Sequence, residues 1–205
     1  MEQPKTAFWR CLYTPGHDTA VLERALAGWH LAGMAVFKGD EGPVSVNYTV
    51  EIDDSWMAKR GSIRGFSGGR RFFHRIERTE DGWSLDGRPN GLSHLTDLDF
   101  GFTPATNLQQ LKRAALQVGE RAEFSVAWFD IDKQALVELP QIYERRDETH
   151  YWYESPTADG YEAMLEIDRF SGFARDYPTL WRMEDSPAES TIIGSSTHIP
   201  VSRAG

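Results

Sequence analysis

Every second residue is apolar in the run Val44-Ser45-Val46-Asn47-Tyr48-Thr49-Val50-Glu51-Ile52-Asp53. Successive side chains of a β-strand point to opposite faces, so this run predicts a strand with one buried face and one solvent-facing side. The same alternation returns in residues 122–128 and 161–168. A period of two that recurs along the chain predicts an all-β protein.

Further strands are predicted where β-branched and aromatic residues gather. They cover residues 8–13, 29–37, 56–65, 71–78, 136–146 and 149–154. Turn-forming pairs such as Gly68-Gly69, Asp81-Gly82 and Asp159-Gly160 lie between the predicted strands. Strands joined by such short turns are antiparallel neighbours. We therefore expect a large antiparallel β-barrel or half-barrel.

The length of 205 residues suits one domain, predicted over residues 1–185, with a Ser/Thr/Pro-rich C-terminal tail over residues 186–205. A hydrophobic content of 40% with seven Trp, seven Tyr and eleven Phe is enough for a large core. The net charge of −9 is a poor match for nucleic acid. Cys11 is the single cysteine, which excludes an internal disulfide. No transmembrane run or export signal is apparent, so a cytoplasmic protein is expected.

A corner is predicted over residues 97–107, with the sequence DLDFGFTPATN. Pro104 prevents a strand from running through this segment. Thr106 or Asn107 can cap the start of a short helix, and one of the two glutamines that follow can complete a capping box. We therefore expect one short helix that begins near Thr106–Asn107.

Several motifs of the chain resemble the putative glycolipid-binding family of bacterial proteins. They are Leu98-Asp99-Phe100-Gly101, Thr103-Pro104-Ala105-Thr106-Asn107, Gln141-Ile142-Tyr143-Glu144-Arg145 and Asp176-Tyr177-Pro178. The resemblance runs from about Trp29 to Trp181. It implies a many-stranded barrel similar to the lipoprotein-localisation carriers, with a glycolipid or other amphiphilic small molecule as partner. It also implies a strand over residues 21–26, although apolar residues there fall at helical spacing.

Aromatic side chains gather on the predicted strands 122–128, 136–146 and 149–154, where a packed core and a binding cavity are both possible. Gln141, Tyr143 and Arg145 alternate, so they face one side of their strand. If that side is the interior, the Arg145 guanidinium needs an acceptor from a ligand or from a carboxylate; otherwise the three form a solvated face. The predicted ligand-binding residues are Trp128, Gln141, Tyr143, Arg145, Tyr151, Tyr153, Asp97 and Asp99.

Other motifs point away from metal or cofactor chemistry. Residues 65–69 match the G-x-S-x-G hydrolase pattern, but a strand-like run follows them, which favours a hairpin turn. The six histidines are His17, His30, His74, His94, His150 and His198, and none has a partner at the spacing of metal ligands. No phosphate-binding or dinucleotide-binding pattern occurs. We expect neither a metal site nor a cofactor.

The favoured function is binding of a glycolipid or lipid-like molecule in an elongated barrel cavity. One alternative is a hydrolase or isomerase that acts on a small amphiphile in that cavity, with Asp97 or Asp99 as acid–base and Arg145 as anion clamp. The two aspartates can equally hold the shape of the corner. An enzyme should place a carboxylate or histidine with a shifted pKa against the cavity. A second alternative is a protein-interaction domain with a large exposed apolar patch.

Overall fold

The computed structural model describes residues 2–184, which form one sheet of 15 strands and one short helix. The strands are β1 (Lys5–Cys11), β2 (Gly16–Ala25), β3 (Gly28–Gly39), β4 (Gly42–Ile52), β5 (Ala58–Ser67), β6 (Arg70–Thr79), β7 (Gly82–Leu85), β8 (Arg88–Gly91), β9 (Leu98–Phe100), β10 (Arg121–Asp130), β11 (Ala135–Arg145), β12 (His150–Ser155), β13 (Tyr161–Ile167), β14 (Ala174–Tyr177) and β15 (Trp181–Met183). The helix is α1 (Asn107–Ala114). The expected all-β fold is confirmed. The predicted tail, residues 186–205, and His198 lie outside the described residues.

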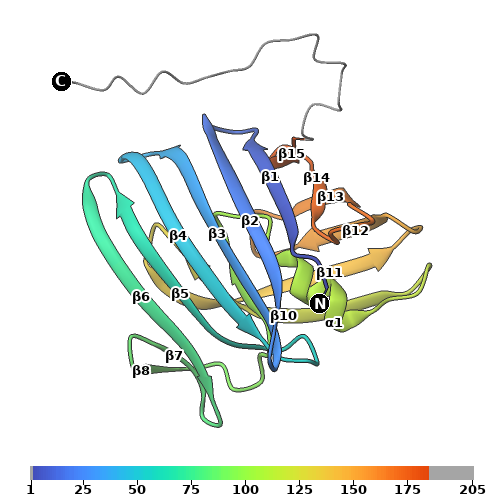
Figure 1. The fold of residues 1–205 in the computed structure, drawn as a ribbon, viewed down its shortest axis with the longest axis horizontal. Coiled ribbons are helices and arrows are strands. Elements are labelled where there is room, and N and C mark those ends of the chain that lie inside the picture. Colours follow the sequence, from blue (N-terminus) through green and yellow to red (C-terminus); the bar gives the residue numbers. More distant parts are fainter. Residues whose placement is uncertain (1, 185–205) are drawn as a thin grey trace, which may run out of the picture.

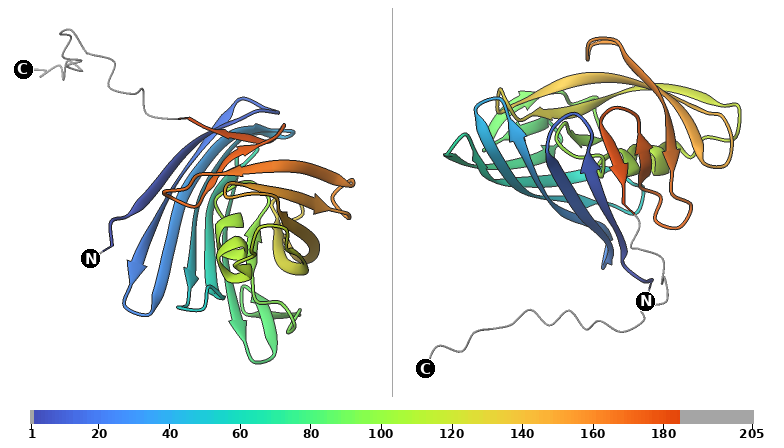
Figure 2. Two further views of the ribbon diagram at one scale, coloured as in Figure 1. Left: turned by 90° about the vertical axis from the view of Figure 1, so that its right-hand side faces the viewer. Right: turned by 90° about the horizontal axis from the view of Figure 1, so that it is seen from above.

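The strand order across the sheet is β8-β7-β6-β5-β4-β3-β2-β1-β15-β14-β13-β12-β11-β10-β9. The pairing of β1 with both β2 and β15 joins the N-terminal and C-terminal parts of the chain. The sheet curls around α1, as Figures 1 and 2 show. Its two edge strands, β8 and β9, do not pair with each other. The half-barrel form of the prediction is confirmed, and the closed barrel is not formed.

One strand pair departs from the antiparallel pattern, because β9 and β10 run parallel. Parallel neighbours need a crossover connection, and here the corner and α1 supply it. A Cβ on Gly61 of β5 would lie 2.6 Å from Leu98 Cδ2, so β9 packs across the inner face of β5. The sheet is therefore antiparallel, as expected, except for this pair at its edge.

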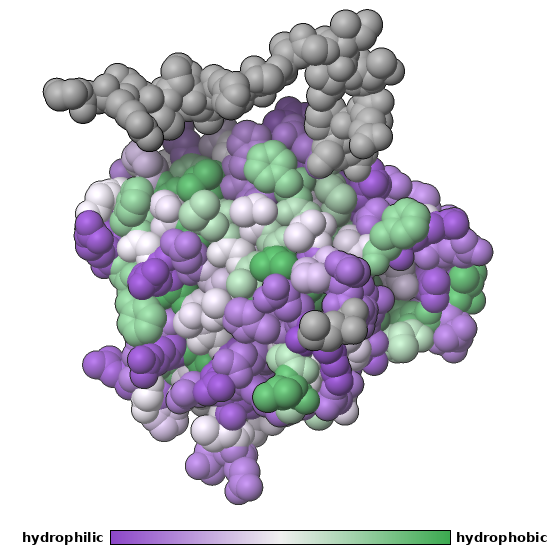
Figure 3. Space-filling view, viewed as in Figure 1, coloured by the Kyte–Doolittle hydropathy of each residue, from purple (hydrophilic) through white to green (hydrophobic). Residues whose placement is uncertain are grey.

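The core lies between the inner face of the curled sheet and the corner with α1. In β4 the apolar residues Val44, Val46, Tyr48, Val50 and Ile52 are all buried, as their alternation predicts. Large apolar side chains also occur on the outer face. Phe8, Met34, Val36, Phe66 and Phe73 are exposed there, and Figure 3 shows apolar residues interspersed with hydrophilic ones on the face viewed in Figure 1.

Two local predictions are confirmed. Residues 21–25, at the end of β2, form a strand and not a helix. The G-x-S-x-G segment ends in the turn of the β5–β6 hairpin, where Gly68 and Gly69 have φ angles of 54° and 82°. Such positive φ angles suit glycine, which has no Cβ to collide with the backbone. This serine therefore does not lie on a strand-to-helix turn.

The helix begins where it was predicted, with Thr106 at its N-cap position, but the expected capping box is wrong. Thr106 already has helical backbone angles, and its hydroxyl makes no capping bond to α1. It donates instead to Asp99 Oδ1 at 2.5 Å and accepts from the Phe100 N–H. The Thr106 hydroxyl thus connects the start of α1 to β9 through two hydrogen bonds, and these hold the helix against the corner.

Candidate functional site

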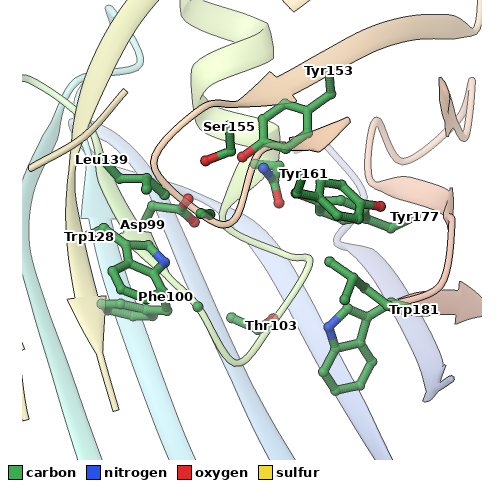
Figure 4. Close-up of a pocket in the computed structure, with 14 residues that line it drawn as sticks. Asp99, Phe100, Thr103, Trp128, Leu139, Tyr153, Ser155, Tyr161, Tyr177 and Trp181 are labelled. Carbon is green, nitrogen blue, oxygen red and sulfur yellow. The ribbon is translucent and has the colours of Figure 1, made fainter. Parts of the chain in front are cut away.

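A cavity of about 230 Å³ lies on the concave side of the sheet, between the corner and the strands at the C-terminal end. Figure 4 shows its walls. They include Asp99, Phe100 and Thr103 from the corner, Trp128, Leu139 and Tyr153 from β10, β11 and β12, and Tyr161, Tyr177 and Trp181 from the C-terminal side. Its walls are mainly apolar and include six aromatic side chains. We refer to this space as the central cavity.

Asp99 contributes a buried carboxylate to the wall of the central cavity. Its Oδ1 accepts from Thr106 at 2.5 Å, and its Oδ2 accepts from Gln141 Nε2 at 2.8 Å. Burial raises the pKa of Asp99, while the hydrogen bonds from Thr106 and Gln141 act in the opposite direction. The site therefore holds a carboxyl group that keeps its proton to a higher pH than an exposed aspartate does.

Gln141 and Tyr143 face the interior, which decides between the two orientations that the sequence left open. Both side chains are buried, and they stand behind the wall of the cavity. The Tyr143 hydroxyl accepts from Asn107 Nδ2 at 2.8 Å, and its ring stacks on Phe124 with centroids 5.5 Å apart. These contacts hold β11 against the start of α1.

Asp97 is fully buried and lies behind the corner. Arg113 of α1 binds both of its oxygens, with Nε at 2.8 Å from Oδ1 and Nη2 at 2.5 Å from Oδ2. This two-point contact matches the planar guanidinium to the carboxylate. Burial raises the pKa of Asp97, and Arg113 opposes that shift. The pair ties the last turn of α1 to the beginning of β9.

Arg145 and Tyr151 lie apart from the central cavity. They line a separate groove of about 660 Å³ beside the C-terminal end of α1. The Arg145 guanidinium donates to the backbone carbonyls of Leu116, Asp147 and Glu148 at 2.8, 3.0 and 3.3 Å. Its acceptors are therefore loop carbonyls and not the ligand or carboxylate considered from the sequence.

Two tryptophans face each other across the central cavity. In Figure 4 the indole nitrogens of Trp128 and Trp181 are turned towards the space between the rings. Among residues 2–184 neither nitrogen has a hydrogen-bond acceptor, although Trp181 is only 3% exposed. The fully buried indoles of Trp9 and Trp83 do have acceptors, since Trp9 donates to Ala174 and Trp83 to Leu95. The cavity thus offers two free N–H donors.

A second cavity, of about 340 Å³, adjoins the first and shares Gly101 and Trp128 with it. Phe37, Phe102 and Ile131 supply apolar surface to this side cavity. The Trp128 ring packs directly against Gly101, and a larger residue would collide with it, because a Cβ on Gly101 would lie 2.4 Å from Trp128 Cζ2. Trp128 therefore lies at the boundary of the two spaces, and its side chain lines both.

A buried polar cluster lies next to the central cavity. The Asp18 carboxylate accepts from the hydroxyls of Tyr48 and Thr103, and Thr103 is itself part of the cavity wall. Burial raises the pKa of Asp18 to about 7, although both hydroxyl contacts act to lower it. The cluster joins β2 and β4 to the corner.

The structure brings together Asp99, Trp128 and Tyr153 among the predicted site residues. Sequence reasoning missed Trp181, Tyr161 and Tyr177 as cavity residues. Tyr161 shares the alternating face of Ala163 and Leu165, and this signal could have placed it inside. Trp181 lies on a strand of three residues, which is too short to show a period.

Among residues 2–184, no group of three or more His, Cys, Asp or Glu side chains is arranged to hold a metal ion. Over the same residues, no helix has the length and apolar character needed to cross a membrane.

Comparisons with known proteins give one family and one fold. The model of a family described as "Putative glycolipid-binding" matches residues 6–183. A crystal structure of a DUF1089 family protein from Pseudomonas aeruginosa is similar, with a TM-score of 0.70 and 22% sequence identity, over 80% of this chain and 91% of that one. At this identity the similarity shows a shared fold. No curated protein matches the chain.

Proposed function

The chain belongs to the putative glycolipid-binding family, and from that premise we propose that it binds a glycolipid or similar amphiphile on the concave side of its half-barrel. The observation that carries this proposal is the central cavity, where aromatic walls surround one buried carboxylate. Ligand pockets combine mostly apolar and aromatic walls with a few polar groups that fix orientation. The side cavity, which shares Gly101 and Trp128 with the central cavity, adds further apolar surface.

Different roles follow for the residues predicted from the sequence. Asp99, Trp128 and Tyr153 would contact the ligand, together with Trp181. Gln141, Tyr143 and Asp97 would hold the wall and the corner in place. Arg145 and Tyr151 would contact only a ligand that extends into the separate groove. A cytoplasmic location stays a prediction of the sequence.

The proposal is tested by closing the mouth of the central cavity without disturbing the core. Ala158 lines the cavity but is exposed in the turn between β12 and β13, so Ala158→Trp should obstruct entry. Thr157→Trp is the matched control, because Thr157 is exposed in the same turn and does not line the cavity. Binding of an alkyl glycoside below its critical micelle concentration would be measured by calorimetry.

We expect saturable binding to the wild type and to Thr157→Trp, and binding at least about tenfold weaker to Ala158→Trp, a loss of about 1.4 kcal/mol. Native mass spectrometry of protein from the expression host should in addition reveal a retained amphiphile. Equal affinity of all three proteins would show that the central cavity is not the binding site.

An enzymatic function is a second candidate, because a carboxylate with a raised pKa faces the cavity. A buried carboxyl with a raised pKa is suited to general acid–base work. Under this alternative, Asp99 would protonate or deprotonate a small amphiphile. The Arg145 guanidinium lies at the separate groove, so it does not serve as an anion clamp inside the central cavity.

Asp99→Asn separates the two candidates. The amide is nearly the same size as the carboxyl but cannot exchange a proton with a substrate. A binding protein would keep its alkyl glycoside affinity within a few fold. An enzyme would lose turnover of a hydrolysable aryl glycoside or ester while it still bound the unreactive analogue. Absence of turnover in the wild-type protein would remove the enzymatic candidate for those substrates.

A further inference from the structure

We propose that the central cavity recognises a single neutral ring that carries several hydroxyl groups, and that the attached alkyl chain leaves past Trp128 into the side cavity. This inference rests on the proposed amphiphile binding and adds the chemistry and orientation of the ligand. It follows from three observations: the free indole donors, the charge of the walls and the sizes of the two spaces.

The donors come from opposite walls. Trp128 and Trp181 turn their N–H groups towards the cavity, and neither group finds an acceptor among residues 2–184. Trp N–H groups usually find a hydrogen-bond partner when the ring is buried, and the space that these two groups face is the central cavity. Trp181 is 3% exposed, so bulk water reaches its ring little. A ligand with acceptor oxygens on two sides would satisfy both donors.

The charge of the cavity walls disfavours anionic head groups. Among the described residues, the fourteen that line the cavity include Asp99 and no Lys, Arg or His. A carboxylate or phosphate would therefore approach Asp99 without any counter-charge, and an unpaired buried charge is costly.

A hydroxyl group suits the same wall in either state of Asp99. It donates to the ionised carboxylate and accepts from the protonated acid. The same hydroxyl can accept a hydrogen bond from an indole N–H. A ring with several hydroxyls thus complements the whole set of polar groups, and its C–H faces pack against the aromatic walls.

The sizes of the spaces place the two parts of the ligand. The central cavity, about 230 Å³, is smaller than the pockets of about 300–1,000 Å³ that hold drug-sized molecules. It accommodates one ring better than a ring with its chain. The side cavity, about 340 Å³, meets it at Gly101 and Trp128 and presents Phe37, Phe102 and Ile131. An alkyl chain attached to the ring would bury its apolar surface there.

The test compares probes that share an octyl chain and differ in the head group: octyl glucoside, octanoate, octyl phosphate and octylammonium, with methyl glucoside as the ring without a chain. Calorimetry at concentrations below micelle formation gives the affinities. We expect octyl glucoside to bind at least about tenfold more tightly than octanoate and octyl phosphate, because an anionic head group would lie unpaired beside Asp99. It should also bind more tightly than octylammonium, because an ammonium group has no acceptor for the two indole N–H groups. Methyl glucoside should bind at least about tenfold more weakly than octyl glucoside, since it lacks the chain.

Trp181→Phe keeps an aromatic wall and removes one N–H donor, so it should weaken octyl glucoside binding about three- to tenfold. Trp29→Phe is the control, because Trp29 stacks on Trp56 and does not line the cavity. Unchanged affinity of Trp181→Phe would overturn the donor role of Trp181.

The outcomes distinguish a failure of the head-group and chain assignment from a failure of the proposed amphiphile binding. Equal binding of the octyl probes would leave amphiphile binding in place and overturn the head-group inference. Tightest binding of octylammonium would identify a cationic head group instead. Equal binding of methyl and octyl glucoside would show that the ligand is a free sugar and that the side cavity holds no chain. Absence of binding by any probe would overturn both proposals.

Discussion

The carboxylate of Asp99 and the amide of Gln141 are joined by a 2.8 Å hydrogen bond that spans β10, the strand between them in the sheet. Both side chains are buried, and Asp99 forms part of the central cavity. The same carboxylate also accepts from Thr106 at the start of α1. One acidic group therefore connects the sheet edge, the helix start and the proposed binding site.

Gln141→Ala removes one of the two side-chain donors to Asp99. We expect a loss of about 1–3 kcal/mol in the free energy of unfolding, because a buried acceptor is left with one bond fewer. Urea denaturation measures this loss. Gln117→Ala serves as the control, since Gln117 is exposed in the loop after α1, and it should change stability by less than about 0.5 kcal/mol. A similarly small effect of Gln141→Ala would show that Asp99 does not depend on this bond.

Arg113→Ala leaves the fully buried Asp97 without its ion-pair partner. Removal of one member of a buried pair typically costs about 3–5 kcal/mol, and the partial exposure of Arg113 places the expected loss at the lower end. The double variant Asp97→Asn/Arg113→Ala should recover part of it, because the uncompensated charge is gone. Thermal or urea unfolding of the single and double variants measures the coupling. Additive losses would contradict the pairing seen here.

Asp18 should make stability depend on pH. Its pKa is raised from 3.8 to about 7 by burial, so the folded protein holds this proton at a pH where the unfolded chain has released it. Its contribution to stability is therefore fully present below pH 3.8 and is lost as the pH rises through about 7. The full change is roughly 4 kcal/mol, from about 1.4 kcal/mol for each pKa unit.

Asp18→Asn cannot ionise, so the stability of the variant relative to the wild type should increase from pH 5 to pH 8. Because other buried carboxyls also titrate, the difference between the two proteins is the quantity to follow, by urea denaturation at each pH. A difference that stayed constant with pH would mean that Asp18 is not protonated in the folded protein.

Arg145→Ala tests whether the guanidinium serves the fold or a ligand. Its three hydrogen bonds go to loop carbonyls at the end of α1 and after β11. We expect a stability loss of about 1–2 kcal/mol, limited by solvent screening of this half-buried group, and an unchanged affinity for octyl glucoside. Arg145→Lys should not restore the stability fully, because lysine lacks the planar fork. Weaker ligand binding with unchanged stability would instead make Arg145 a ligand contact.

The strands could be predicted from the sequence where apolar and polar residues alternate over enough positions. β4 alternates over its whole length, so the buried face of Val44 to Ile52 follows from local sequence. β14 and β15 have four and three residues, which is too few to display alternation, and Trp181 was missed for that reason. The corner was recognised from Pro104 and its neighbours, but its crossover to the parallel β10 depends on packing across the sheet.

The residues that line the cavity were harder to predict from the sequence than the strands. Tyr143 and Arg145 share a face of β11, yet the Tyr143 ring is buried in the core while the Arg145 side chain reaches the carbonyls of the next loop. The difference arises because Arg145 is the last residue of its strand. Which residues meet across the concave side depends on the curl of the sheet, and no local pattern encodes that curl.

Gly101→Ala examines the boundary between the two cavities. The added Cβ would lie 2.4 Å from Cζ2 and 2.8 Å from Cε2 of Trp128, so the indole must move. Overpacking of this kind typically costs about 1–3 kcal/mol of stability. A displaced Trp128 would change the tryptophan emission spectrum and would weaken octyl glucoside binding, because the ring both donates to the head group and borders the path of the chain.

The double variant Gly101→Ala/Trp128→Phe distinguishes this collision from a general effect on the corner. The smaller phenyl ring lacks the outer part of the indole, which contains the atoms nearest the new Cβ. The free energy of unfolding of the double variant should therefore lie within about 1 kcal/mol of that of Trp128→Phe alone. The effects of two substitutions in contact are not additive, whereas those of distant substitutions are. Octyl glucoside affinity should remain reduced, because the indole donor is absent. If the two substitutions were simply additive, or if Gly101→Ala left emission and affinity unchanged, the ring of Trp128 would not form the boundary between the two spaces.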